Sequence, residues 1–140
     1  MGFFSVVFPV VASGVFAVWF HVSDLQCRRS PAKRLKTEEN LVTYSRLPEA
    51  NARGFTRGYR AMALAIDSLF VMFLSGFLMP ILPAWDDVLA VGFLAGLFIG
   101  GVFVGMAKGI FNHNRPQWLV QPERRAELGV KQQLRSESSH

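Results

Sequence analysis

Two charged residues stand inside long apolar stretches of this 140-residue sequence. Asp67 lies in "AMALAIDSLFVMFLSGFLMPIL", residues 61–82, and Lys108 lies near the end of "VLAVGFLAGLFIGGVFVGMAKGIF", residues 88–111. A charge in the hydrocarbon of a membrane costs about 3 kcal/mol at a helix centre unless it is paired. Asp67 lies about two turns after the start of its stretch, and Lys108 lies about one turn before the end of its own. Consecutive membrane helices run in opposite directions, so both residues lie near the same side of the membrane at similar depths. We therefore predict an Asp67–Lys108 ion pair; alternatively, Asp67 is a proton or cation site.

The other reactive side chains do not form a catalytic or metal-binding pattern. Cys27 is the only cysteine, and His21, His113 and His140 do not share a metal-ligand spacing with it. The sequence also lacks the G-x-S-x-G, P-loop and H-E-x-x-H motifs. We predict a protein that is not an enzyme and has no metal and no cofactor. Cys27 is expected to be an inert thiol, with palmitoylation beside the membrane as the alternative.

One segment, "KGIFNHNRP" at residues 108–116, resembles the first motif, K-x6-R-P, of the membrane-bound lipid phosphatases. That family also needs a P-S-G-H segment and a later nucleophilic histidine with an orienting aspartate. The residues after Pro116 contain neither segment, and without a nucleophile there is no phosphoryl-enzyme chemistry. We interpret Lys108, His113 and Arg115 as side chains that reach from a helix end to the membrane interface.

Three apolar blocks, at residues 3–22, 61–82 and 88–111, must position these side chains. Each is close to or above the roughly 20 residues that a helix needs to cross a bilayer, and none shows the polar stripe of a soluble helix. The sequence therefore predicts an all-α integral membrane protein with three transmembrane helices. Residues 1–140 form a single membrane domain, with a basic loop at 23–60 and a polar tail at 112–140.

The positive charges predict an orientation. Lysines and arginines are frequent in the loop 23–60 and in the tail, whereas the connection "PAWDD" between the second and third blocks carries only Asp86 and Asp87. Because positive loops stay on the cytoplasmic side, we expect the N-terminus outside and the C-terminus inside. The membrane would be a bacterial cytoplasmic membrane or an organellar inner membrane. We attribute the net charge of +5 to this topology, not to nucleic-acid binding.

Two parts of the basic loop have recognisable patterns. The first, "PAKRLKTEENLVTYSRL", residues 31–47, is compatible with a short surface helix, with Pro31 in its first turn. The second, "ANARGFTRGYR", places Arg53, Arg57 and Arg60 on one helical face. We expect these three arginines to bind the phosphates of anionic lipid headgroups, or to be an ordinary basic flank. The last ten residues of the tail are expected to be loosely ordered.

The third block is unusually rich in glycine. At about 100° per residue, its glycines form two strips on opposite sides of the helix, Gly92, Gly96 and Gly100 on one side and Gly101, Gly105 and Gly109 on the other. Such small-xxx-small, or glycine-zipper, strips allow helix backbones to approach closely in lipid. We predict that one strip contacts another helix of the chain and that the other contacts a second membrane subunit; alternatively, the first and second helices of the chain supply both contacts.

The segment "RGYRAMALAIDSLFVMF", residues 57–73, resembles the opening helix of the RDD family of small bacterial membrane proteins. Arg60 and Asp67 match that family's first arginine and first aspartate in this helix. The resemblance implies a small ion or solute carrier that uses Asp67. The chain departs from the family in its third block, which has no acidic residue at the place of the family's second aspartate.

The absence of catalytic motifs, the basic surface and the glycine strips favour one function above the others. We predict a non-catalytic accessory or assembly subunit of a larger inner-membrane complex of respiratory, photosynthetic or secretion type. The alternatives are the RDD-like carrier and a holin-like pore former. Holins usually have a much shorter loop between their first two helices than the one at residues 23–60.

Overall fold

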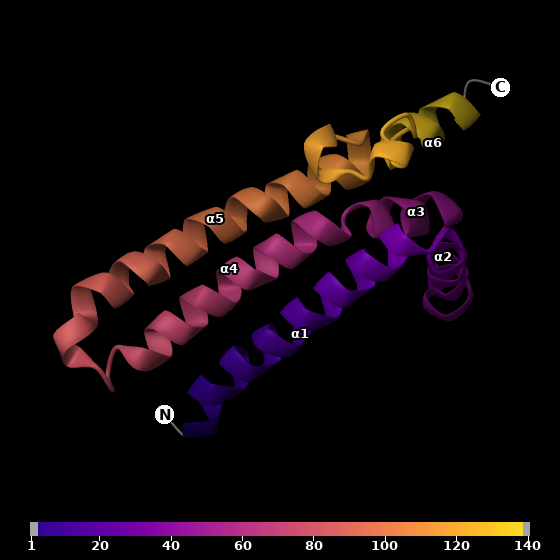
Figure 1. The fold of residues 1–140 in the computed structure, drawn as a ribbon. Helices are drawn as coiled ribbons and strands as arrows, with labels where there is room; N and C mark the ends of the chain where they lie inside the picture. The colour runs from indigo at the N-terminus through magenta and orange to yellow at the C-terminus, as the bar shows by residue number, and fades with distance from the viewer. Residues whose placement is uncertain (1–2, 139–140) are drawn as a thin grey trace.

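A computed structural model describes residues 3–138 of the chain, and these residues fold into helices without any strand. Three long helices, α1 (Phe3–Arg29), α4 (Tyr59–Leu78) and α5 (Asp86–His113), run side by side (Figure 1). The middle helix, α4, packs against both of the others. All three are long and apolar enough to cross a membrane. The chain is therefore an all-α, multi-pass membrane protein, as predicted.

The long helices differ from the predicted blocks at their ends. α1 continues through Arg29 instead of ending at residue 22, because leucine, glutamine and two arginines among the residues that follow the apolar block are good helix formers. α4 ends at Leu78, two residues before Pro80, which cannot donate a helical hydrogen bond. α5 begins at Asp86, where a carboxylate stabilises the positive end of the helix dipole. Apolar composition alone marks the part of a helix in lipid, not its full length.

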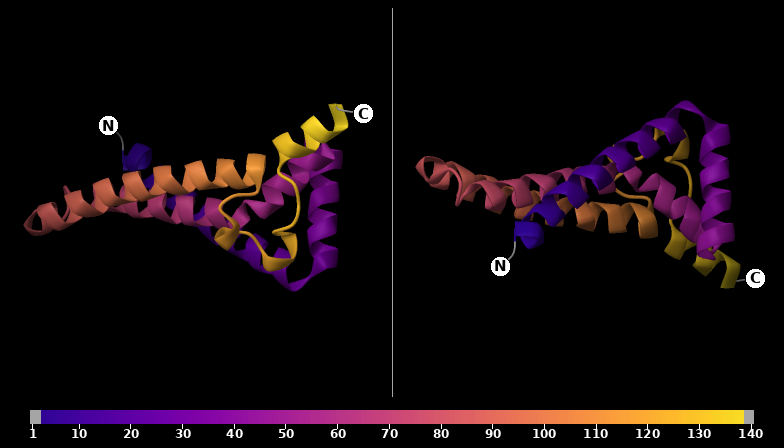
Figure 2. Two further views of the ribbon diagram at one scale, coloured as in Figure 1. Left: turned by 90° about the horizontal axis from the view of Figure 1, so that it is seen from above. Right: turned by 90° about the horizontal axis from the view of Figure 1, so that it is seen from below.

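The predicted basic loop is itself helical. It contains α2 (Pro31–Ser45) and α3 (Glu49–Arg57). α2 begins at Pro31 as expected, with the Ser30 side chain accepting a hydrogen bond from the Lys33 backbone at 3.4 Å. Figure 2 shows that α2 lies across the end of the bundle and not along it (Figure 2). This end, which we call the basic end, is opposite the turn that contains η1 (Pro83–Trp85) and Asp86.

The tail folds back onto the basic end. Two short 3-10 turns, η2 (Gln117–Leu119) and η3 (Pro122–Arg124), lead to α6 (Val130–Ser138), which contacts both α3 and α5. The expectation of loose order over the last ten residues is wrong for residues 131–138, because Val130 is buried and anchors the helix. Residues 139 and 140 lie outside the described part of the chain.

The first glycine strip is the contact between α4 and α5. A Cβ atom on Gly96 would lie 2.6 Å from the Ser68 carbonyl oxygen and 2.9 Å from the Met72 nitrogen. A Cβ atom on Gly92 would lie 2.7 Å from the Ser75 hydroxyl, and one on Gly100 would have ordinary contacts with α4. The two backbones are therefore close enough that only glycine fits at the centre of the contact.

An aromatic cluster joins α1 to α3 and α4 near the basic end. Phe20 contacts Tyr59 edge-to-face at 5.7 Å between ring centroids, and Tyr59 contacts Phe55 at 5.5 Å in the same geometry. Cys27 is buried in the same cluster. Its sulfur is thus not accessible for palmitoylation, which supports the interpretation of Cys27 as an inert thiol.

Candidate functional site

A hydrogen-bonded pair of ionisable residues lies on the side of the transmembrane bundle. His21 of α1 and Asp67 of α4 are joined by a distance of 2.7 Å between Nε2 and Oδ2. The predicted Asp67–Lys108 pair is wrong, since Lys108 is exposed on α5 and forms no ion pair within residues 7–138. α4 turns Asp67 toward α1, whereas α5 packs on the opposite side of α4.

The sequence contains a signal for this pair that the prediction did not use. His21 precedes Arg28 by seven residues, and Asp67 follows Arg60 by seven residues. Arg28 and Arg60 both lie at the basic end, so His21 and Asp67 both lie about 10 Å from it at a rise of 1.5 Å per residue. Because α1 and α4 are adjacent and run in opposite directions, residues at equal depth meet.

The pair is not enclosed by the bundle. The side chains of His21 and Asp67 are 52% and 40% exposed. Three positions one turn away on the same helices are apolar and exposed, namely Val18 and Leu25 on α1 and Val71 on α4. The pair is therefore a small polar patch on an otherwise apolar surface of the membrane-spanning helices.

Each member of the pair keeps an unused polar atom. Within the described residues, Nδ1 of His21 and Oδ1 of Asp67 have no hydrogen-bond partner. An imidazole and a carboxylate can share or exchange a proton, and each can also bind a group on a third molecule. A molecule that covers the patch can therefore form one further hydrogen bond with His21 and one with Asp67.

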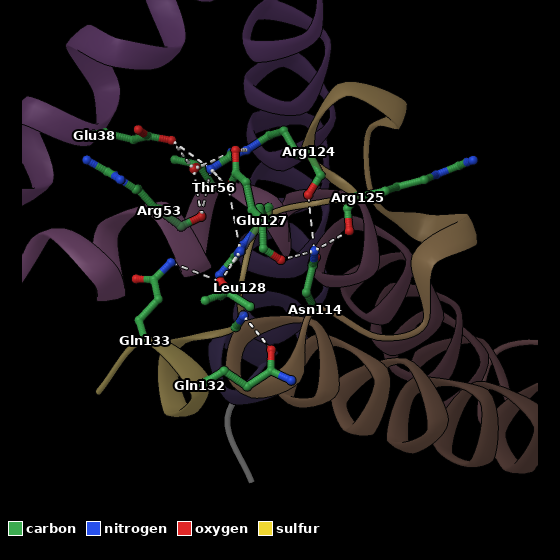
Figure 3. A network of polar contacts seen from close by, with 12 residues as sticks. Glu38, Arg53, Thr56, Asn114, Arg124, Arg125, Glu127, Leu128, Gln132 and Gln133 are labelled. Carbon is green, nitrogen blue, oxygen red and sulfur yellow. Dashed lines mark hydrogen bonds and ion pairs between the residues drawn. The ribbon is translucent and has the colours of Figure 1, made fainter. Parts of the chain in front are cut away.

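The basic end contains a second cluster of charges, which is buried. Arg124 is 2% exposed, and its guanidinium is held from several sides. Its contacts are the Thr56 hydroxyl at 2.9 Å, the Arg53 carbonyl at 3.2 Å, the Glu38 carboxylate at 3.2 Å and the Glu127 carboxylate at 3.0 and 3.1 Å (Figure 3). We call these residues the Arg124 cluster. It ties α2, α3 and the tail into one unit.

The turn after α5 brings the tail to this cluster. Asn114 adopts a left-handed conformation with φ of 55°, which ends α5. Its side-chain amide donates to the carbonyl oxygens of Arg124, Arg125 and Glu127 at 3.1, 3.1 and 2.6 Å, as the dashed lines in Figure 3 show. Asparagine is one of the few residues that adopt this conformation readily, so one residue both reverses the chain and holds the tail.

The predicted lipid-binding arginines have different surroundings. Arg57 is buried, and its guanidinium donates to the Leu128 carbonyl at 2.7 Å and lies 3.5 Å from Glu127. Burial lowers the pKa of Arg57 from its ordinary value, with Glu127 opposing that change. Its expected role at lipid headgroups is therefore wrong. Arg53 is exposed beside Glu49, and Arg60 is exposed on the first turn of α4.

The second glycine strip is divided. A Cβ atom on Gly101 or Gly105 would have nothing within 4 Å, whereas one on Gly109 would lie 2.6 Å from the Arg115 carbonyl oxygen. Gly109 thus contacts the chain's own tail, in contrast to the prediction of a contact with another subunit. Gly101 and Gly105 form a smooth, uncovered face of α5.

Metal binding has no support in the described residues, since residues 7–138 contain no group of three histidine, cysteine or acidic side chains suited to a metal ion. No protein-family model matches the chain, and no curated protein or solved structure matches it either. The resemblance of residues 57–73 to the RDD family therefore stays a prediction. The function has to be argued from the geometry.

Proposed function

We propose that this protein is a non-catalytic accessory or assembly subunit of a larger membrane complex. The observation that carries the proposal is the exposed His21–Asp67 pair on the membrane-spanning surface. Ionisable side chains within transmembrane segments almost always face a protein interior or a water-filled cavity. A half-exposed pair, surrounded by exposed valine and leucine, thus calls for a polar partner supplied by another protein.

The partner that fits the patch is a transmembrane helix with a hydrogen-bonding side chain. It would contact the apolar surface around the pair and bond the unused atoms of His21 and Asp67, since polar side chains join helices in lipid. Gly101, which lies on an uncovered face of α5 outside the hollow beside the tail, supplies a second place where a neighbouring helix can approach closely. The two faces lie on different helices, so the chain can contact two neighbours.

The arrangement of the other polar groups favours a subunit over a carrier. A carrier needs several polar groups along a path, but three serines in the middle of the helices bond to their own backbone or fill helix contacts. Ser13 donates to the Pro9 carbonyl at 2.7 Å and Ser68 to the Leu64 carbonyl at 2.8 Å, while Ser75 lies at the contact with Gly92. None of these serines extends the polar patch across the bundle.

We further propose that the basic end faces the cytoplasm, or the corresponding side of an organellar inner membrane, which places the N-terminus outside. Single cysteines at Asp86 and at Ser138, introduced in a Cys27→Ala background, should react with an impermeant thiol reagent from opposite sides. Labelling of both from the same side would overturn the orientation and the three-span topology together.

The subunit proposal is tested by purification in mild detergent with paired substitutions. The wild-type chain should co-migrate with a large complex at fixed stoichiometry. The double variant His21→Leu with Asp67→Leu leaves no unpaired charge, so it should stay in the membrane but leave the complex. The control is Lys108→Leu, which removes an exposed charge that has no ion-pair partner within residues 7–138 and should remain assembled. A wild-type chain that purifies alone, or a double variant that stays assembled, contradicts the proposal.

The second candidate is a small carrier, because an imidazole–carboxylate pair can pass a proton and because residues 57–73 resemble the RDD family. In reconstituted vesicles, Asp67→Asn should then abolish proton-coupled uptake or efflux while the variant remains fully assembled. Loss of assembly without a transport defect in the assembled fraction favours the subunit.

A further inference from the structure

We propose that the basic end of α5 binds one anionic phospholipid, with the phosphate between Arg115 and Arg125 and an acyl chain along the neighbouring face of α5. This site is separate from the His21–Asp67 pair, which belongs to α1 and α4. The two proposals can therefore fail independently.

A hollow of about 680 Å³ lies where the tail turns back beside α5. One wall is the face of α5 formed by Val102, Gly105, Met106 and Gly109, and the other is the segment 115–117. The wall on α5 runs into the membrane-spanning part of the helix and has no charge. The segment 115–117 closes the hollow at the basic end with polar groups.

Two glycines give the hollow its shape. Gly109 permits the tail to approach, since its Cβ position would be 2.6 Å from the Arg115 carbonyl oxygen, and the Arg115 backbone donates to the Gly109 carbonyl at 3.3 Å. Gly105, one turn deeper, has nothing within 4 Å of its Cβ position. The missing side chain at Gly105 leaves this wall of the hollow smooth and open.

The polar end of the hollow is positively charged and unneutralised. Arg115 is exposed, and its guanidinium has no ion-pair or hydrogen-bond partner among the described residues. Arg125 is bonded to the lining residue Gln117, because the Arg125 Nε donates to the Gln117 carbonyl at 3.1 Å while the Gln117 amide donates to the Arg125 carbonyl at 3.2 Å. In Figure 3 the Arg125 side chain points away from the Arg124 cluster.

The combination fits a phospholipid better than any other ligand of a membrane surface. Guanidinium groups bind phosphate oxygens in bidentate geometry, and the apolar wall of α5 begins next to them on the membrane side. Trp118 follows the lining segment and is 57% exposed, as expected for a ring at headgroup level. The two arginines would bind the phosphate of a water-soluble phosphate ester in the same way. The test must therefore compare a whole phospholipid with such an ester.

The test measures lipid binding by native mass spectrometry of the detergent-purified full-length chain. With dioleoyl phosphatidylglycerol as the probe, one lipid should bind tightly, and dioleoyl phosphatidylcholine should bind much more weakly. Arg115→Gln with Arg125→Gln should weaken phosphatidylglycerol binding by at least about tenfold, given the contribution of each arginine near an anionic surface. The control, Arg29→Gln with Arg135→Gln, removes the same charge from exposed positions outside the hollow and should bind as the wild type does.

A second variant distinguishes lipid binding in the hollow from general electrostatic attraction to the basic end. Gly105→Leu keeps all charges, and its Cβ position has no atom of a neighbouring element within 4 Å among the described residues, but its side chain extends into the hollow, so it too should lose the lipid. Equal loss in both double arginine variants, or unchanged binding in Gly105→Leu, overturns the site. Binding of glycerol 3-phosphate as tight as that of phosphatidylglycerol would identify a soluble phosphate ester as the ligand and overturn the lipid assignment.

Discussion

The Arg124 cluster and the His21–Asp67 pair are both contacts between acidic and basic side chains. Only in the Arg124 cluster does every guanidinium nitrogen have a partner within the chain. Arg124 is 2% exposed and contacts two carboxylates, a hydroxyl and a backbone carbonyl. His21 and Asp67 are 52% and 40% exposed and have one contact with each other. The first cluster connects α2, α3 and the tail in a water-facing unit, while the second lies on a surface that faces lipid or another protein.

The difference follows from the two surroundings. At the basic end, water can solvate any charge that the chain leaves free, so a buried arginine persists only because its partners are well placed. Within the membrane-spanning helices there is no water to complete an unfinished contact. A complete cluster therefore indicates a structural role for Arg124, and the incomplete one supports the proposal that His21 and Asp67 contact another subunit.

The largest expected effect is at Arg124. Arg124→Leu should destabilise the basic end by about 3–5 kcal/mol, the cost of stranding one partner of a buried ion pair, because Glu38 and Glu127 lose their shared cation. Thermal unfolding in detergent and protease cleavage of the tail measure the loss. Arg125→Leu changes a neighbouring exposed arginine and should shift stability by no more than about 0.5 kcal/mol. Equal stability of the two variants would show that the cluster is not structural.

Asn114 should have the next largest effect. Asn114→Ala loses three hydrogen bonds of about 1 kcal/mol each and places a less suitable residue at a φ of 55°. Asn114→Gly loses the same hydrogen bonds but accepts the conformation freely. Both variants should expose the tail to protease, and the alanine variant should be less stable by about 1 kcal/mol. Identical melting temperatures of the alanine and glycine variants would show that the left-handed backbone conformation at position 114 does not affect stability.

The two sides of α5 should respond differently to the same substitution. Gly96→Leu places a large side chain against the Ser68 carbonyl and should cost about 1–3 kcal/mol through overpacking, which lowers the abundance of the chain. The Cβ position of Gly101 has nothing within 4 Å among the described residues, so Gly101→Leu should leave the purified protein as stable as the wild type. Helix propensity does not explain a loss in either variant, since leucine favours helix more than glycine does. Equal damage would mean that Gly101 is covered within the chain.

The smallest expected effects are at the exposed pair. In detergent, without the proposed second subunit, Asp67→Asn should change the stability of the chain by only about 0.6 kcal/mol. This is the typical value for a side-chain hydrogen bond between transmembrane helices. Lys108→Leu should have no measurable effect, because Lys108 has no ion-pair partner among the described residues. Should Lys108→Leu prove the more damaging of the two, the pairing of Asp67 with His21 would be in doubt. Differential scanning fluorimetry of both variants makes the comparison.

The sequence determined the membrane architecture. Three apolar stretches of sufficient length leave the backbone no alternative to helices, because every peptide group in lipid must bond within its own segment. The spacing at Gly92, Gly96 and Gly100 also predicted a close helix contact, and the structure has α4 at that place. Pro31 predicted the first turn of α2 for an equally local reason, its fixed φ. Patterns of this kind depend only on residues near one another in the chain.

Only the tertiary structure decided which charges meet. Asp67 pairs with His21 and not with Lys108, because α4 turns that residue toward α1, and the direction of a side chain around a helix is set by packing and not by depth. Arg57 and Arg124, typical surface residues in a basic sequence, are buried because Asn114 brings a tail from 70 residues away onto α3. Periodicity describes one helix at a time, and it does not include the rotation of each helix against its neighbours.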